Sequence, residues 1–424
     1  MNRRINDYFI VGFALFAMFF GAGNLIFPPS LGRLVGDNYI VSIVGFLITG
    51  VGLPLVGILS CIKSGGNFES IAGKVGRIFA VAITTALILA IGPMLAIPRT
   101  AATTFELSLQ PLIPTINPVI AIIIYFIINL IFVLKPSSII DTIGRFLTPI
   151  LLIMLFAIII KGIISPIGPI TDTGYSNAFS NSLLEGYQTM DAMASVIFAS
   201  IIISSVKMKG YKNDRDIIKV TTYASLVAVI GLSLVYGGLL YLGSQTSDLY
   251  DSHITRTTLI MNISKSVLGN FGGIALAISV GVACLTTSIG LTATGAEFFT
   301  RLSKGKLSYT FNVLVITLVS MIIAFSGVDL IVSIAAPILQ IIYPVIIVLI
   351  LTNFLEDFIK NNKIIAITTY VTLAVSLLSA INSLTNNSLK TFFDIIPLSN
   401  IGFSWVIPCI VTFVISFIFL NNKK

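Results

Sequence analysis

Long apolar stretches separated by short polar connections follow one another along the whole chain of 424 residues. A helix needs roughly 20 mostly apolar residues to cross the hydrocarbon core of a bilayer. The pattern therefore predicts an all-α integral membrane protein of about twelve transmembrane helices, with no room for a soluble domain. The predicted spans are 8–31, 39–60, 78–97, 117–134, 146–164, 184–206, 217–243, 270–299, 309–325, 330–353, 364–381 and 401–420. In an alternative division, segment 98–116, which contains scattered polar residues, extends the third helix.

The N-terminal segment has two interpretations. Arg3 and Arg4 followed by an apolar run up to Gly21 would also suit a secretory signal peptide. More apolar sequence follows at once, from Asn24 to Phe27. We therefore expect a first spanning helix that is kept in the mature protein.

The basic residues between the spans predict the orientation. With the N-terminus inside, the cytoplasmic loops and termini hold nineteen of the 25 lysines and arginines. Cytoplasmic loops of membrane proteins carry such an excess of Lys and Arg. The sequence thus predicts a multi-pass protein of the plasma membrane with both termini in the cytoplasm. Six basic residues fall on the outer face in this division: Arg33, Arg99, Lys161, Arg256, Lys265 and Lys390.

Composition argues against several functions. The chain is 56% hydrophobic and only 10% charged, with a mean hydropathy of +1.02, whereas a soluble domain is about 25% charged. The net charge of +8 is spread over loops and forms no single basic patch, so no nucleic-acid partner is expected. Cys61, Cys284 and Cys409 lack metal or disulfide spacing, and His253 is the single histidine. No GxxxxGK[ST] run offers an ATP site, so ATP hydrolysis is not expected as a source of energy.

The first span contains an unusual run of helix-weakening residues. Gly21, Gly23 and Asn24 lie in mid-span, and Pro28 and Pro29 follow. Each such residue weakens a helix by up to about 1 kcal/mol relative to alanine. In lipid, freed backbone groups are tolerated where protein or a water-filled cavity satisfies them. The run predicts a broken helix, and the alternative is close helix packing through small residues, with the proline pair ending the helix.

The sixth span carries polar residues near its start. Glu185, Gln188, Thr189 and Asp191 precede a long apolar run. Ionisable residues within a membrane are costly unless they face a cavity or a partner, so a functional use is the default hypothesis. The alternative is that this stretch is still an external loop and the span begins near Ala192.

Spans one and six occupy corresponding positions if spans 1–5 and 6–10 are inverted repeats. The single domain 1–424 would then comprise repeat one over about 1–164, repeat two over about 184–353 and additional helices over about 364–420. Paired interruptions in corresponding helices point to a transporter's binding site at the middle of the membrane. The exposed half-helix ends offer N–H groups to a carboxylate and C=O groups to a cation.

The eighth span adds consecutive hydroxyl groups, Thr286, Thr287 and Ser288, shortly after Ala283. A hydroxyl inside a helix commonly bonds the carbonyl one turn earlier, and that is the simpler explanation. Three consecutive hydroxyl residues point to most of the circumference of the helix, so one or two of them must face protein rather than lipid. Neutral oxygens of this kind suit a monovalent cation such as Na⁺.

Two motifs carry a resemblance to a known family: Phe13–Gly32, FALFAMFFGAGNLIFPPSLG, and Gly92–Glu106, GPMLAIPRTAATTFE. In these motifs, in length and in span count the sequence resembles the bacterial branched-chain amino acid:cation symporters of the amino acid–polyamine–organocation superfamily. The resemblance implies the five-plus-five inverted-repeat fold of sodium-coupled leucine transporters, with helices 1 and 6 broken.

The resemblance also implies site residues. It places a coupling Na⁺ at the carbonyls of Ala17, Phe20 and Ala283 and the hydroxyls of Thr286 and Thr287. It assigns substrate binding to Gly21, Ala22, Gly23, Asn24, Met190 and Asp191. The substrate carboxylate would meet the N–H groups of Ala22 and Gly23, and the ammonium would face carbonyls of both breaks. Met193 and residues 92–97 are further candidates for an aliphatic pocket.

The function implied is secondary active symport of leucine, isoleucine and valine into the cell, driven by a sodium gradient, with no enzyme activity and no obligate protein partner. The alternative is proton-coupled transport of the same or other neutral amino acids, since some members of the superfamily replace the sodium with a lysine on the fifth helix. Lys161 is the lysine in that span, and its distance from the start of the span places it near the outer surface. Asp191 would instead carry a proton or join a second cation site.

Two other classes of membrane protein fit the sequence less well. A membrane-embedded enzyme would need clustered His, Cys or acidic residues within the bilayer, which the spans lack. An ion channel would show a repeated filter-like loop or a ring of charge. Twelve spans with paired breaks match neither class.

Overall fold

The computed structural model describes residues 2–134, 138–251, 253–385 and 388–421. Three of the basic residues predicted to be cytoplasmic, Lys135, Lys423 and Lys424, lie outside these ranges. The described chain forms helices and connecting turns and contains no strand, which confirms the all-α prediction. The helices of the first half are α1 (Asn2–Phe19), α2 (Ala22–Val35), α3 (Tyr39–Leu47), α4 (Leu53–Lys63), α5 (Phe68–Gly73), α6 (Arg77–Leu89), α7 (Ala96–Thr104), α8 (Gln110–Leu112), α9 (Pro118–Leu134) and α10 (Ser138–Ile164).

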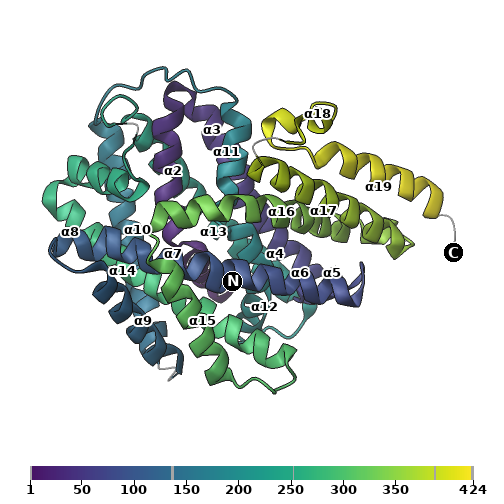
Figure 1. The fold of residues 1–424 in the computed structure, drawn as a ribbon. Helices are drawn as coiled ribbons and strands as arrows, with labels where there is room; N and C mark the ends of the chain where they lie inside the picture. Colours follow the sequence, from purple (N-terminus) through teal and green to yellow (C-terminus); the bar gives the residue numbers. More distant parts are fainter. Residues whose placement is uncertain (1, 135–137, 252, 386–387, 422–424) are drawn as a thin grey trace.

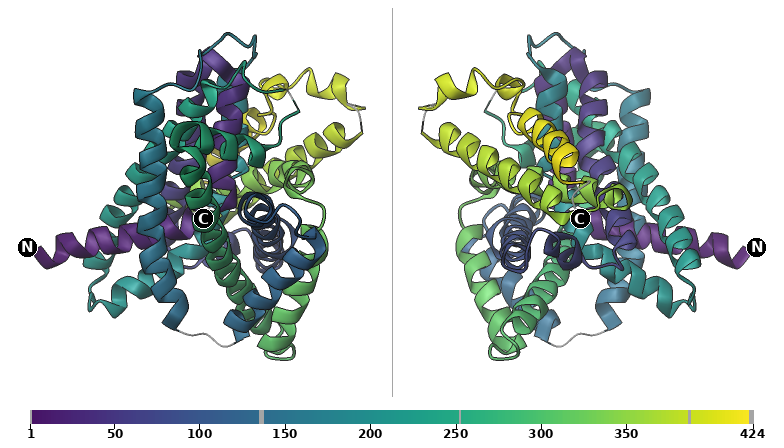
Figure 2. Two further views of the ribbon diagram at one scale, coloured as in Figure 1. Left: turned by 90° about the vertical axis from the view of Figure 1, so that its left-hand side faces the viewer. Right: turned by 90° about the vertical axis from the view of Figure 1, so that its right-hand side faces the viewer.

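The second half continues with further helices of varied length. They are α11 (Ala178–Tyr187), α12 (Asp191–Met208), α13 (Asp214–Ser244), α14 (Arg256–Leu302), α15 (Tyr309–Ala324), α16 (Val328–Phe354), α17 (Asn362–Leu384), α18 (Lys390–Phe393) and α19 (Val406–Leu420). Figure 1 shows α17 and α19 side by side at one edge of the bundle, beside α16. In Figure 2 the N-terminal end of α1 projects from the body.

Several helical stretches of the described chain are long and apolar enough to cross a membrane. There are seven: Ala22–Lys63, Arg77–Leu112, Asp191–Met208, Asp214–Ser244, Arg256–Leu302, Val328–Phe354 and Asn362–Leu384. Shorter apolar helices add Pro118–Leu134, Leu151–Ile164, Tyr309–Ala324 and Val406–Leu420. These stretches confirm a membrane-embedded chain, while the count of twelve spans and the repeat boundaries stay predictions.

The surface is apolar where a soluble protein would be polar. On α9, Ile120 and Ile131 expose more than half of their surface, whereas Tyr125 and Asn129 are buried. This inversion suits a helix with lipid on one side and polar partners on the other.

Both predicted helix breaks are present. The first span divides between α1, which ends at Phe19, and α2, which begins at Ala22. Pro28 and Pro29 lie inside α2 and do not end it, so the alternative for this span is wrong.

The sixth span divides between α11, which ends at Tyr187, and α12, which begins at Asp191. Met190 between them adopts a left-handed backbone with φ of 65°, a conformation that costs a non-glycine residue about 1 kcal/mol or more. The stretch before Ala192 is therefore the end of a helix followed by a break and not an open loop, while the point at which the membrane-spanning part begins stays a prediction.

Two predicted loops are largely helical. The third span continues to Leu112 through π-helical turns at Ala90–Met94 and Phe105–Leu109, with a kink at Gly92, whose backbone is not helical. Arg99 is therefore an interior residue of a long helix, and its assignment to an outer loop is wrong. The predicted loop 244–269 is helical from Arg256 onwards, and α14 bends at Gly269, where φ is +68°.

Candidate functional site

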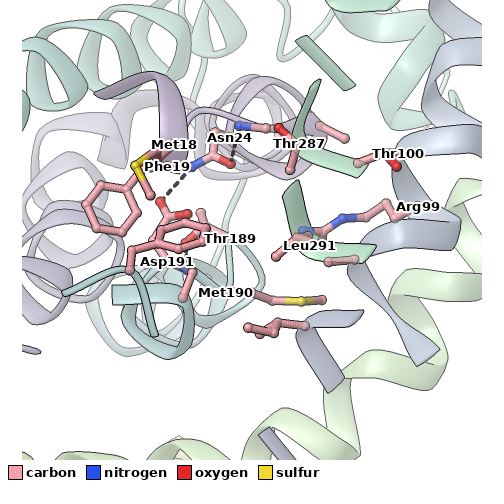
Figure 3. Close-up of a pocket in the computed structure, with 16 residues that line it drawn as sticks. Met18, Phe19, Asn24, Arg99, Thr100, Thr189, Met190, Asp191, Thr287 and Leu291 are labelled. Atoms are coloured by element: carbon pink, nitrogen blue, oxygen red, sulfur yellow. Dashed lines mark hydrogen bonds between the residues drawn. The ribbon is translucent and has the colours of Figure 1, made fainter. Parts of the chain in front are cut away.

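The two helix breaks border one cavity of about 40 Å³, space for about three waters. Figure 3 shows the side chains that surround it. They come from both breaks and from the helices packed beside them: Met18, Phe19, Gly21, Ala22, Asn24, Ile91, Ala96, Arg99, Thr100, Thr189, Met190, Asp191, Ala194, Phe198, Thr287 and Leu291.

Much of the cavity wall is apolar. Met190, a predicted binding residue, lines it, as does Ala96 from the predicted stretch 92–97. Met193 is fully buried but lies outside the wall. Phe198 and Leu291 add bulk from α12 and α14. Pockets for small molecules combine such apolar walls with a few placed polar groups.

Asp191 supplies the carboxylate of the cavity. Its side chain is 3% exposed, and its Oδ2 accepts hydrogen bonds from Asn24 Nδ2 at 2.6 Å and from the Tyr236 hydroxyl at 3.0 Å. Asn24 Nδ2 also donates to the Tyr236 hydroxyl. The Thr189 side chain lies beside the same carboxylate. Two donors thus fix Oδ2, while the carboxylate as a whole borders the cavity, where a ligand can reach it.

Asn24 connects the two breaks. Its Oδ1 accepts a hydrogen bond from the backbone N–H of Gly21 at 3.1 Å, while its Nδ2 reaches Asp191. In a continuous helix the N–H of Gly21 would donate to the carbonyl of Ala17. Because Asn24 takes that N–H, the break deprives the Ala17 carbonyl of its regular donor. The carbonyls of Ala17 and Phe20, both predicted cation ligands, belong to this opened turn.

The start of α2 offers backbone donors. Ala22 and Gly23 are its first two residues, and the first N–H groups of a helix have no partner within the helix. The helix dipole adds partial positive charge at the same place. Ala22 lines the cavity, so this helix end suits the carboxylate predicted to bind there.

Three of the predicted cation ligands form a compact group of oxygens on α14. The hydroxyls of Thr286 and Thr287 each donate to the carbonyl of Ala283 at 3.0 Å. Among these residues it is Thr287 that lines the cavity. A methyl group at Gly21 would lie 3.7 Å from the Thr287 side chain, so the first break faces this group of oxygens.

The neighbouring turn of α14 is held in place by α9 and α7. The Tyr125 hydroxyl donates to the Cys284 carbonyl at 3.0 Å and lies 3.1 Å from the Thr100 hydroxyl. The cation-ligand candidates are thus supported from the side away from the break.

Several polar residues of the site were not among the predicted binding residues: Arg99, Thr100 and Thr189 in the cavity wall, and Tyr236 beside it. Arg99 lines the cavity with 3% of its surface exposed, and Tyr236 comes from the predicted seventh span. The sequence did offer a signal that Arg99 lies within a helix, because no helix-breaking residue stands between Pro98 and Glu106. Tyr236 has no local signal, since a tyrosine in a span is ordinary.

The arrangement as a whole defines a class of protein. Two broken helices, with unpaired backbone groups and a carboxylate around one cavity, are typical of secondary transporters. The fold agrees with solved structures of Mhp1, a nucleobase-cation-symport-1 family transporter. The TM-score is 0.63 to its closed conformation with bromovinylhydantoin bound, at 15% identity over 96% of this chain and 90% of that one. It is 0.64 to the inward-facing conformation, at 13% identity over 96% and 89%.

The sequence then gives the family. Residues 4–423 match the family described as branched-chain amino acid transport protein, and the chain belongs to it. The branched-chain amino acid permease BraB of Bacillus subtilis is 35% identical over 98% of this chain and 95% of its own length. The branched-chain amino acid permease BrnQ of Salmonella typhimurium is 33% identical over 97% and 95%. The chain is a transporter and not an enzyme, as its sequence predicts.

Proposed function

We propose that this protein carries leucine, isoleucine and valine into the cell together with Na⁺. The observation that carries the proposal is the cavity between the two breaks, which joins an apolar wall to the end of α2 and to the Asp191 carboxylate. An aliphatic amino acid needs that combination. The printed names of the relatives, branched-chain amino acid permeases, support the same substrate class.

Sodium is favoured as the coupling ion because the oxygens of Ala283, Thr286 and Thr287 are neutral and adjacent. The proton alternative requires a titrating group at the site. Lys161 lies in the last turn of α10 and is exposed, far from the position of a midplane switch. Asp191 stays a candidate proton carrier or ligand of a second cation.

Uptake into proteoliposomes tests the function. An imposed inward sodium gradient should drive accumulation of leucine, and isoleucine and valine should compete with it. Lysine and glutamate should not compete, because the cavity wall offers no partner for a charged side chain beyond the groups that bind the substrate backbone. Inhibition by lysine as strong as by valine would contradict an aliphatic pocket.

Thr287→Val is expected to raise the sodium concentration for half-maximal uptake about tenfold, since an unmade polar contact costs about 1–3 kcal/mol. Thr294 is the matched control. It also lies on α14 and donates to the carbonyl one turn earlier, Gly290, at 2.8 Å, but it is half-buried and does not line the cavity. Thr294→Val should leave the sodium dependence unchanged. If both variants shift the sodium concentration for half-maximal uptake equally, the Thr287 hydroxyl only bonds the helix backbone and does not bind the ion.

We also propose that both termini are cytoplasmic. In a chain without the native cysteines, cysteine at Asp172 or Asp248 should react with an impermeant reagent added to intact cells, because both positions are exposed in the loops predicted to be external. Cysteine at Lys212, exposed at the other end of α13, should react after permeabilisation only. The reverse pattern would invert the orientation.

A further inference from the structure

Arg99 is a buried cation that forms no direct ion pair with a described acidic side chain, although the Asp191 carboxylate lies near enough to interact with its charge. Its Nη1 donates to the Gln188 carbonyl at 2.7 Å, and its guanidinium lies 5.3 Å from the centre of the Phe27 ring. Its Nε has no hydrogen-bond partner among the described residues. The ion pairs of the described chain do not include Arg99. A buried guanidinium in this state is costly unless a further group completes its contacts.

The guanidinium lies against the start of α2. A methyl group added to Gly23 would come within 2.7 Å of Arg99 Nη2, so the glycine leaves the space that the arginine occupies. Gly23 also carries one of the free N–H groups at the positive end of this helix. The side-chain donors of Arg99 therefore lie beside the backbone donors at the start of α2, where Arg99 and Ala22 both line the cavity, and this combination suits an anion.

Another part of the cavity, at the start of α12, suits a cation. The carbonyls of Glu185, Gly186 and Tyr187 at the second break accept backbone N–H groups, and that of Gln188 accepts from Arg99. The Asp191 carboxylate, which lines the cavity, is thus the strongest acceptor there. Figure 3 shows Asp191 and Arg99 entering the cavity region from different helices.

We infer that the substrate is held as a zwitterion between two buried charges of the protein. The α-carboxylate binds Arg99 together with the N–H groups at the start of α2, and the α-ammonium binds Asp191. This inference rests on the proposed function and makes it more specific, because recognition by backbone dipoles alone, as the sequence predicts, needs neither charge. Selectivity for free α-amino acids follows, since an amide or an amine would leave one buried charge unpaired.

The test compares leucine with two analogues on the purified full-length protein, using ligand-dependent thermal stabilisation to obtain affinities. Leucinamide keeps the ammonium and lacks the carboxylate, and 4-methylpentanoate keeps the carboxylate and lacks the ammonium. The wild type should prefer leucine over leucinamide by on the order of 100-fold. In Arg99→Gln this preference should fall to within about fivefold, and Arg99→Lys should restore part of it. In Asp191→Asn the preference for leucine over 4-methylpentanoate should be lost instead.

Arg256 provides the matched control. Its guanidinium lies 5.9 Å from the same Phe27 ring, but it pairs with Asp329 at 2.6 Å and does not line the cavity. Arg256→Gln should keep the wild-type preference for leucine over leucinamide. A purely structural role of Arg99 would weaken both ligands equally and leave their ratio intact.

The possible failures are distinguishable. An unchanged leucine-to-leucinamide ratio in Arg99→Gln, with leucine bound by the wild type, overturns the role of Arg99 and leaves the proposed function standing. A wild type that binds none of the three branched-chain amino acids overturns the proposed function itself. If Arg99→Gln yields no folded protein, Arg99→Lys is the deciding variant. Its shorter, non-planar cation should reduce the preference for leucine over leucinamide at least tenfold. An unchanged preference in Arg99→Lys again contradicts the inference.

Discussion

Asp191→Asn is expected to lower sodium-driven leucine uptake by about 100-fold or more, while Lys161→Met leaves uptake nearly intact. The substitution keeps the size of a side chain that is 3% exposed and removes its charge. The hydrogen bonds from Asn24 and Tyr236 then meet a neutral group, and the substrate ammonium loses its partner. Removing one member of a buried charge pair costs about 2–5 kcal/mol, which exceeds the effect of any exposed charge.

Initial rates in proteoliposomes, with the amount of protein matched by immunoblot, give the measurement. Asp248→Asn is the control, because Asp248 is exposed in a loop and its loss should not change uptake. The two coupling hypotheses also separate here. Uptake that follows a pH gradient without sodium and disappears in Lys161→Met would establish the proton alternative and reject sodium coupling.

Gly32→Ala is expected to destabilise the folded protein by about 3 kcal/mol, the upper part of the range for overpacking a filled interior. The added methyl would lie 1.9 Å from the backbone carbonyl oxygen of Leu240 on α13. Gly243 faces the same interface, and a methyl there would lie 2.1 Å from the Pro29 carbonyl oxygen. Because backbone rather than a flexible side chain is in the way, α2 and α13 must separate, and small residues are what allow helices in membranes to pack so closely.

The loss is measurable as a lower apparent melting temperature of the detergent-solubilised protein. Gly290→Ala is the control, since its α14 position has open space around the added methyl and alanine favours the helix. Equal stability of the two variants would show that α2 and α13 separate without cost. The position matters for function as well, because α2 carries Asn24 and the helix end at the cavity.

Sequence alone determined the features that depend on neighbouring residues. Apolar runs long enough for a bilayer gave the membrane class and most of the helices. The glycines around Ala22 and the acid at Asp191 marked both breaks, because helix propensity and the cost of a buried charge act locally. The spacing from Ala283 to Thr287 also placed three oxygens on one turn, where the structure has both hydroxyls 3.0 Å from the Ala283 carbonyl oxygen.

Tertiary structure decided which of these groups meet. Asn24 and Asp191 are 167 residues apart in the chain, and Tyr236 reaches the same carboxylate from a third helix. No local pattern encodes such contacts, because they depend on how the helices pack. Arg99 shows the difference most clearly. Its sequence context allowed either an outer loop or a longer third helix, and π-helical turns stabilised by packing brought it into the cavity. A charge is expelled from the membrane or retained at a site according to what surrounds it, and only the folded chain supplies those surroundings.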